Sequence, residues 1–294
     1  MGREKAASRW LFSKAVQGSS RQATCHRDRE DAPLVDALVD LAESRAFDEL
    51  VEFHLSPSPH HPCAAAVARE AANRVIAIVA NAIERQGIAR IALSGGSTPK
   101  RVYPLLLEPA RRDAVDWSAV EFFWGDERAV PPDHPESNFG AAYFMLISQL
   151  PNVRSDRIHR MQAEAPDLDA AALAYETELR LAFGVRGNVP PTFDLIWLGM
   201  GMDGHTASLF PGSPALDEVE RWVVPSRNPI GERRMTLTFP VLNAARETIF
   251  VLDGEDKADA LAQVRDRNTF LPAARVTGPA VHWIVDAAAA AQVV

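Results

Sequence analysis

The chain has 294 residues, enough for one large domain or two small ones, and its 47% hydrophobic content can build a sizeable core. Its net charge of -8 argues against a dedicated nucleic-acid surface, and no apolar run approaches the ~20 residues needed to span a bilayer. The only cysteines, Cys25 and Cys63, cannot form a disulfide framework or a zinc pattern. These properties predict a soluble, cytoplasmic protein with no nucleic-acid and no membrane partner.

The N-terminal segment differs from the rest of the chain. Residues 1–31 are rich in Arg, Lys and Ser and show little apolar periodicity. A transit peptide has a similar composition, but acidic residues such as Glu4 and Asp28 are unusual in one. We expect a disordered extension over residues 1–35, or a start codon assigned too far upstream, followed by a single α/β domain over residues 36–294.

From residue 49 onward, apolar strands alternate with amphipathic helices. The predicted strands cover residues 49–55, 88–93, 120–124, 158–161, 193–198, 222–225, 233–239, 248–252 and 281–285. The predicted helices cover residues 64–85, 139–150, 167–183 and 255–265, with a further helix from Pro99 and an alanine-rich helix at the end. In the helix over residues 167–183 we expect the core side chains to be Leu173, Tyr175, Leu179 and Phe183. This alternation favours an α/β fold with a mostly parallel sheet.

The strand over residues 88–93 runs into a polar, glycine-rich turn made of Ser94, Gly95, Gly96 and Ser97. Ser97 or Thr98 can cap the helix that begins near Pro99. Backbone N–H groups at such a junction bind anions, and phosphate in particular. An ordinary capped turn between strand and helix is the alternative, and the spacing of a Walker loop is missing.

Three charged residues, Asp126, Glu127 and Arg128, come soon after the strand over residues 120–124. Burying them without partners would be costly. At the ligand-binding edge of a sheet they make sense as a carboxylate beside a guanidinium. The alternative is a surface ion pair, which contributes little to stability.

The strand over residues 193–198 and the loop after it organise the chain. Gly199, Gly201 and Gly204 fall within six residues, and glycine lets the backbone turn tightly or approach a ligand closely. His205 follows where the carboxyl end of the strand opens into a loop, the edge at which open α/β sheets bind ligands. Imidazole is the side chain best suited to moving a proton near neutral pH. A lone histidine is more often structural, but the glycines and the strand-end position favour a functional one.

Further cations, Arg233, Arg234 and Lys257, lie near other strand ends. Lys257 opposes the dipole of the helix over residues 255–265, and such local conflicts tend to mark function. Together with a carboxylate, the glycine-rich turn and His205, these cations suggest a small anionic substrate, such as a phosphorylated one. A covalent serine or cysteine mechanism is not expected, because the chain has no G-x-S-x-G elbow and no cysteine near a strand-end histidine. His205 would act on water or on a substrate carbon.

The motifs resemble the 6-phosphogluconolactonase family. The matching segments come in the family's order within about residues 55–290: residues 92–99, 123–128 with Ser137 and Asn138, 198–211, 234–239 and 254–257. The segment around His205 is a specific signature, whereas the Gly-Gly turn is shared with relatives. The resemblance implies a doubly wound, mostly parallel sheet with helices on both faces, a Rossmann-like three-layer sandwich. Glucosamine-6-phosphate deaminases and ribose-5-phosphate isomerases share that sheet.

The resemblance also implies an activity, the hydrolysis of 6-phospho-D-glucono-1,5-lactone to 6-phospho-D-gluconate in the oxidative pentose phosphate pathway. His205 would be the general base that activates water, and Asp126 would tune or orient the site. The residues expected to bind substrate or phosphate are Ser94, Gly95, Gly96, Ser97, Arg128, Gly204, Arg234 and Lys257. No metal and no organic cofactor is implied, and the sequence leaves both a monomer and a homodimer open.

Two other functions remain open from the sequence. One is a sugar-phosphate isomerase or deaminase, a different reaction on the same fold. The other is a non-catalytic sugar-phosphate sensor, although such proteins usually carry a DNA-binding domain and no helix-turn-helix is evident in this acidic chain.

Overall fold

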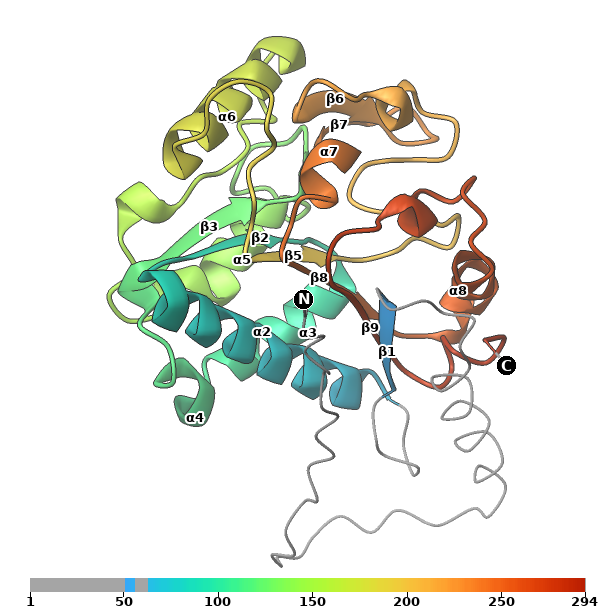
Figure 1. The fold of residues 1–294 in the computed structure, drawn as a ribbon, viewed down its shortest axis with the longest axis horizontal. Helices are drawn as coiled ribbons and strands as arrows, with labels where there is room; N and C mark the ends of the chain where they lie inside the picture. The colour runs from blue at the N-terminus through green and yellow to red at the C-terminus, as the bar shows by residue number, and fades with distance from the viewer. Residues whose placement is uncertain (1–50, 56–62, 294) are drawn as a thin grey trace, which may run out of the picture.

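The main sheet has six parallel strands in the order β1-β9-β8-β5-β2-β3 (Figure 1). The computed structural model describes residues 51–55 and 63–293, so the predicted extension over residues 1–35 lies outside the described residues. The strands are Val51–Leu55 (β1), Ala89–Leu93 (β2), Val120–Trp124 (β3), Leu195–Leu198 (β5), Glu247–Leu252 (β8) and Val281–Val285 (β9). Each of them overlaps a strand predicted from the sequence.

Helices cover both faces of this sheet because its side chains alternate between two hydrophobic clusters. In β5, Leu195 and Trp197 point into one cluster, and Ile196 and Leu198 point into the other. The first cluster is covered by Ala64–Gln86 (α2), Ser97–Leu106 (α3) and Asn138–Met145 (α5). The second is covered by Leu168–Phe183 (α6), Phe239–Leu242 (α7) and Ala258–Arg265 (α8). This arrangement confirms the predicted doubly wound, three-layer α/β fold.

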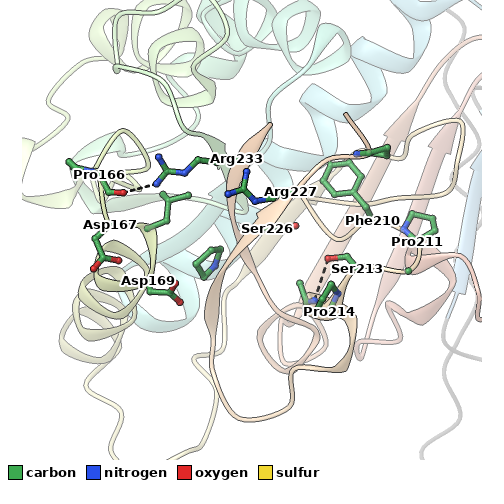
Figure 2. A pocket seen from close by; sticks show the side chains of 15 residues that line it. Pro166, Asp167, Asp169, Phe210, Pro211, Ser213, Pro214, Ser226, Arg227 and Arg233 are labelled. Atoms are coloured by element: carbon green, nitrogen blue, oxygen red, sulfur yellow. Dashed lines mark hydrogen bonds between the residues drawn. The ribbon is translucent and has the colours of Figure 1, made fainter. Parts of the chain in front are cut away.

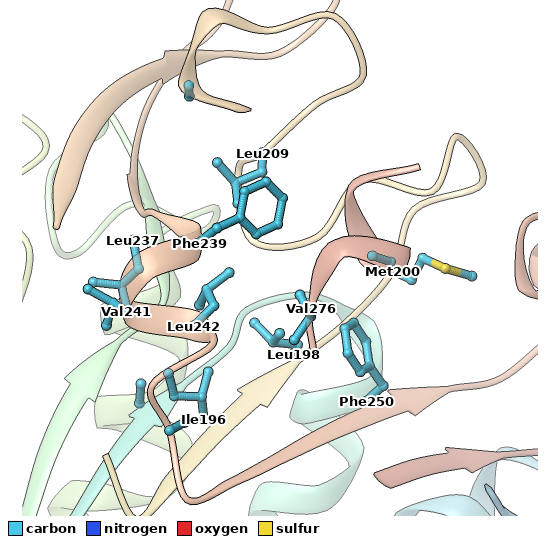
Figure 3. Close-up of a cluster of buried hydrophobic side chains, with 14 of the residues drawn as sticks. Ile196, Leu198, Met200, Leu209, Leu237, Phe239, Val241, Leu242, Phe250 and Val276 are labelled. Atoms are coloured by element: carbon cyan, nitrogen blue, oxygen red, sulfur yellow. The ribbon is translucent and has the colours of Figure 1, made fainter. Parts of the chain in front are cut away.

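The second cluster connects the sheet to the segments that build the site. Figure 3 shows Leu198 of β5 beside Phe250 of β8 and beside Val276, and Ile196 of β5 below Leu242 of α7. A short helix, Pro109–Arg112 (α4), follows α3. Among the residues that the structure describes, no helix has both the length and the apolar character that crossing a membrane requires.

A second, antiparallel sheet lies above the main one in the order β4-β7-β6 (Figure 1). Its strands are Asp126–Arg128 (β4), Val223–Arg227 (β6) and Arg233–Leu237 (β7). The sequence predicted β6 and β7, but it placed the residues of β4 only as charges beyond a strand end. Three residues are too short for a periodic pattern, and β4 exists because it pairs with β7.

The start of one predicted helix and the whole of another are wrong. Helix α3 begins at Ser97, not near Pro99, and Gly96 is its N-cap with a φ of +105° and no side-chain capping bond. The Thr98 hydroxyl donates instead to Asp253 at 2.6 Å. Residues 286–293 form turns in place of the predicted alanine-rich helix, and the Asp286 carboxylate accepts the N–H groups of Gly254 and Ala289 there. So short a segment gains little from helix formation by itself.

Two smaller predictions also fail. The strand over residues 158–161 is reduced to one isolated bridge, between Ile158 and Phe122. Leu173 is 53% exposed, whereas Tyr175 and Leu179 are buried as expected. Ala171 and Ala172 complete the buried face of α6, and position 173 lies on the other side of the helix.

Candidate active site

A pocket of about 260 Å³ opens at the carboxyl edge of the main sheet. Its walls include the turn after β2 and the loop after β5, two neighbouring strands from which the chain proceeds in opposite directions across the sheet. Such a topological switch point is where open α/β sheets bind ligands. Asp253 and Lys257, which follow β8, complete the rim.

Most of the predicted site residues line this pocket, namely Ser94, Gly95, Gly96, Ser97, Asp126, Arg128, His205 and Lys257. Gly204 and Arg234 are not among the lining residues. Gly204 has a φ of +74°, and a Cβ there would lie 2.8 Å from a methyl carbon of Leu271, so this glycine allows the loop to pack. Arg234 forms an ion pair with Glu232 at 2.6 Å and lies opposite Arg128 in the β4–β7 register.

His205 is oriented by a carboxylate that the sequence analysis missed. Asp203 Oδ1 lies 2.5 Å from His205 Nδ1 and also accepts the backbone N–H of His205 at 3.1 Å. In the tautomer that carries its proton on Nδ1, this proton makes the hydrogen bond to Asp203, and Nε2 is the basic nitrogen of the ring. Burial opposes the ionisation of Asp203, but the hydrogen bonds and charge of His205 outweigh it, so the pKa of Asp203 lies below its usual range. A carboxylate two residues before the histidine was the signal that could have revealed this pair.

The predicted partner, Asp126, is held by other groups. It is buried, its Oδ2 accepts the Ser208 hydroxyl at 2.7 Å, and its Oδ1 accepts the Asn138 amide at 3.2 Å. The other amide atom, Asn138 Oδ1, lies only 1.7 Å from the position that a Cβ of Gly95 would occupy. Position 95 therefore needs glycine for close approach, and Asn138 joins the turn after β2 to β4.

Glu127 supports the site from outside the pocket lining. Its buried carboxylate accepts the backbone N–H groups of Arg128 at 2.7 Å, Asn138 at 2.8 Å and Phe139 at 2.7 Å. Burial raises the pKa of Glu127 against the opposing effect of these bonds. The side chain thereby fixes the start of α5 relative to β4. The local sequence pattern did not predict this role.

The pocket contains several groups that can bind an anion. The N-terminal amides of α3 have no side-chain cap, and Lys257 and Arg128 line the same pocket. The carboxylate of Asp253 accepts a hydrogen bond from the Thr98 hydroxyl, and an ion pair with Arg101 offsets its charge. Nowhere in residues 51–55 or 63–293 do three His, Cys, Asp or Glu side chains gather as a metal site. The cofactor-free reaction remains a prediction.

Comparisons with known proteins point to one family. Residues 62–283 match the family described as glucosamine-6-phosphate isomerases/6-phosphogluconolactonase. A 6-phosphogluconolactonase of Streptomyces coelicolor is 38% identical over 239 residues, which cover 77% of this chain and 90% of that protein. One from Synechocystis is 42% identical over 186 residues, or 63% of this chain and 75% of that protein. The solved 6-phosphogluconolactonase from Trypanosoma cruzi superposes with a TM-score of 0.69 at 29% identity, covering 84% of this chain and 97% of that one.

Proposed function

The chain belongs to the glucosamine-6-phosphate isomerase/6-phosphogluconolactonase family, and we infer that its pocket is the active site of a lactone hydrolase. The enzyme hydrolyses 6-phospho-D-glucono-1,5-lactone to 6-phospho-D-gluconate in the oxidative pentose phosphate pathway. The observation that carries the site assignment is the pair of His205 and Asp203 at the pocket. Lactone hydrolysis by the purified protein, corrected for spontaneous ring opening, tests the activity. No acceleration over the spontaneous rate would contradict it. The cytoplasmic location stays a prediction.

In the proposed mechanism His205 is a general base. Its Nε2 takes a proton from a water molecule while the water oxygen attacks C1 of the lactone. The C1 carbonyl becomes a tetrahedral oxyanion, and Arg128 is the cation that β4 supplies to stabilise it. When the oxyanion collapses, the bond between C1 and the ring oxygen breaks. The ring oxygen then receives the proton from His205, which regenerates the neutral base and releases the open-chain acid.

The phosphate of the substrate is placed at the start of α3. Uncapped amides there, the Ser97 side chain and Lys257 offer hydrogen-bond donors and positive charge on one side of the pocket. Binding energy from this remote group can orient the reacting carbonyl. The phosphate site therefore supports turnover as well as binding.

We expect Lys257→Ala to lower kcat/KM for the phosphorylated lactone by about 10- to 100-fold, the range for a hydrogen bond to a charged group. The rate with glucono-1,5-lactone, which lacks the phosphate, should change little. Steady-state kinetics with both lactones measures the difference. Lys100→Ala is the matched control, since Lys100 is exposed on α3 and does not line the pocket. Equal losses with both lactones would contradict the phosphate assignment.

Gly201→Ala tests the position of the base without removing it. A Cβ at residue 201 would lie 2.1 Å from His205 Nδ1 and 2.6 Å from Asp203 Oδ1. We expect a folded protein in which the imidazole is displaced and kcat falls by about 10²-fold or more. Lactone turnover measures the loss of kcat, and circular dichroism checks that the variant is folded. Gly278→Ala is the control, because its nearest contacts would be ordinary ones at 3.6 Å. A normal kcat in Gly201→Ala would show that catalysis does not depend on the position of the His205 ring.

A further inference from the structure

The structure has a second and larger pocket, of about 930 Å³ (Figure 2). It opens between the start of α6, residues 210–215 and the strands β6 and β7. Much of its wall is apolar, formed by Phe210 together with Pro166, Pro211, Pro214, Pro225 and Pro229. Its volume falls in the ~300–1,000 Å³ range of pockets that hold small organic ligands.

Two arginines of this pocket lie directly opposite each other on neighbouring strands. Arg227 of β6 and Arg233 of β7 are direct partners in the antiparallel register. Like charges that are directly opposed across strands destabilise a sheet. Arg233 donates to the Pro166 carbonyl at 2.8 Å, and Arg227 donates to the Gly231 carbonyl at 3.0 Å. Across the described ranges of the chain, neither guanidinium forms an ion pair with a carboxylate. The backbone thus orients two charges that no ion pair in those ranges compensates.

The two carboxylates of the pocket, Asp167 and Asp169, already have other partners. Asp167 accepts the N–H of Ala170 at 3.0 Å as the N-cap of α6. Asp169 faces Arg221, with 3.4 Å between its Oδ1 and a guanidinium nitrogen. Figure 2 shows both carboxylates on the α6 side of the pocket, away from Phe210 and Ser213. They leave the arginine pair available to an external anion, and their remaining oxygens can accept hydroxyl groups.

We propose that this pocket is a second binding site, which takes a phosphorylated sugar with its phosphate on Arg227 and Arg233. Planar guanidinium groups bind phosphate oxygens through paired, charge-assisted hydrogen bonds. The proline rings and Phe210 pack against the C–H faces of the sugar, and Asp169 and Ser213 bind its hydroxyl groups. The bound anion removes the repulsion between the opposed arginines.

The second pocket shares a wall with the active site. The Phe210 ring lines the second pocket and lies 4.6 Å, centroid to centroid, from the His205 ring. A chain of hydrogen bonds runs in parallel, from the Ser226 hydroxyl to the Ser208 carbonyl at 2.6 Å and from the Ser208 hydroxyl to Asp126 at 2.7 Å. A ligand that contacts Phe210 therefore changes the surroundings of the catalytic base.

Calorimetric titration of the full chain with glucose 6-phosphate tests the site. Lys257→Ala is the parent variant, because it weakens the phosphate contact of the catalytic pocket. We expect saturable binding to this parent, an at least tenfold higher Kd when Arg227→Gln or Arg233→Gln is added, and no change with Arg154→Gln. Arg154 is an exposed arginine that lines neither pocket. No binding to the parent, or a Kd in both pocket variants equal to that of the parent, would overturn the proposal.

Three further measurements sharpen the result. Glucose without phosphate should not bind detectably, and inorganic phosphate should bind at least tenfold more weakly than glucose 6-phosphate. Equal affinity for inorganic phosphate would overturn the sugar part of the proposal. The imidazole NMR signals of His205 should shift as the parent is saturated and stay in place in the Arg227→Gln variant. Unchanged His205 signals in the saturated parent would overturn the contact through Phe210.

Discussion

His205→Asn should reduce kcat for lactone hydrolysis by about 10²- to 10⁴-fold, the usual contribution of a positioned general base. Asparagine keeps a polar side chain of similar reach but cannot accept the proton of the attacking water. Because the side chain is about one third exposed, its replacement leaves no buried cavity. The variant should therefore fold normally and still bind 6-phosphogluconate. Single-turnover lactone hydrolysis and product titration measure these two properties.

The pH profile identifies the titrating group. The pKa of Asp203 is lowered, so this carboxylate is ionised at and above its ordinary range and loses its charge only at lower pH. The wild-type rate should then fall on the acid side with one ionisation, and this fall should vanish in His205→Asn. His134→Asn is the matched control, since His134 is an exposed histidine outside the pocket. A near-normal kcat in His205→Asn would make His205 a structural residue.

Asp194→Ala should lower the free energy of unfolding by about 2–4 kcal/mol and leave the catalytic pocket intact. The Asp194 side chain is only 2% exposed and accepts Arg85 at 2.7 Å, Gln86 at 2.8 Å and the backbone N–H of Arg90 at 2.9 Å. These bonds join the end of α2 to the starts of β2 and β5, at the edge of the sheet opposite the pocket. Alanine would leave the Arg90 N–H without this acceptor. Arg85 is 44% exposed and can turn toward water, which keeps the loss below that of a fully buried pair.

Urea denaturation measures this loss as a lower midpoint with an unchanged slope. Asp156→Ala is the control, because it removes an exposed ion pair with Arg154 whose contribution should be at most about 1 kcal/mol. At urea concentrations below the unfolding transition, kcat of Asp194→Ala should stay near the wild-type value. A loss below about 1 kcal/mol would show that water replaces the network, contrary to the argument from burial.

The strands and the edge that carries the site could be predicted from the sequence, because both follow from local patterns. The apolar run of β5 gives a strand buried on both faces, and glycines directly after it mark the point where the chain turns. Parallel strands all end at the same edge, so residues that follow different strands, such as Gly95 and His205, come together without further information. Local patterns failed where tertiary contacts decided the outcome, as at Asp286 and the C-terminal turns.

The sequence by itself determined the alternation of strands and helices and the sheet edge at which His205, Asp126 and the turn around Gly95 meet. The tertiary structure alone decided which carboxylate partners His205, because Asp126 is held by Ser208 and Asn138 whereas Asp203 reaches Nδ1. It also decided that Arg227 and Arg233 are opposed. The physical reason is the range of the interactions. Periodicity and strand ends depend on neighbouring residues, whereas strand register and hydrogen-bond partners depend on segments distant in the chain.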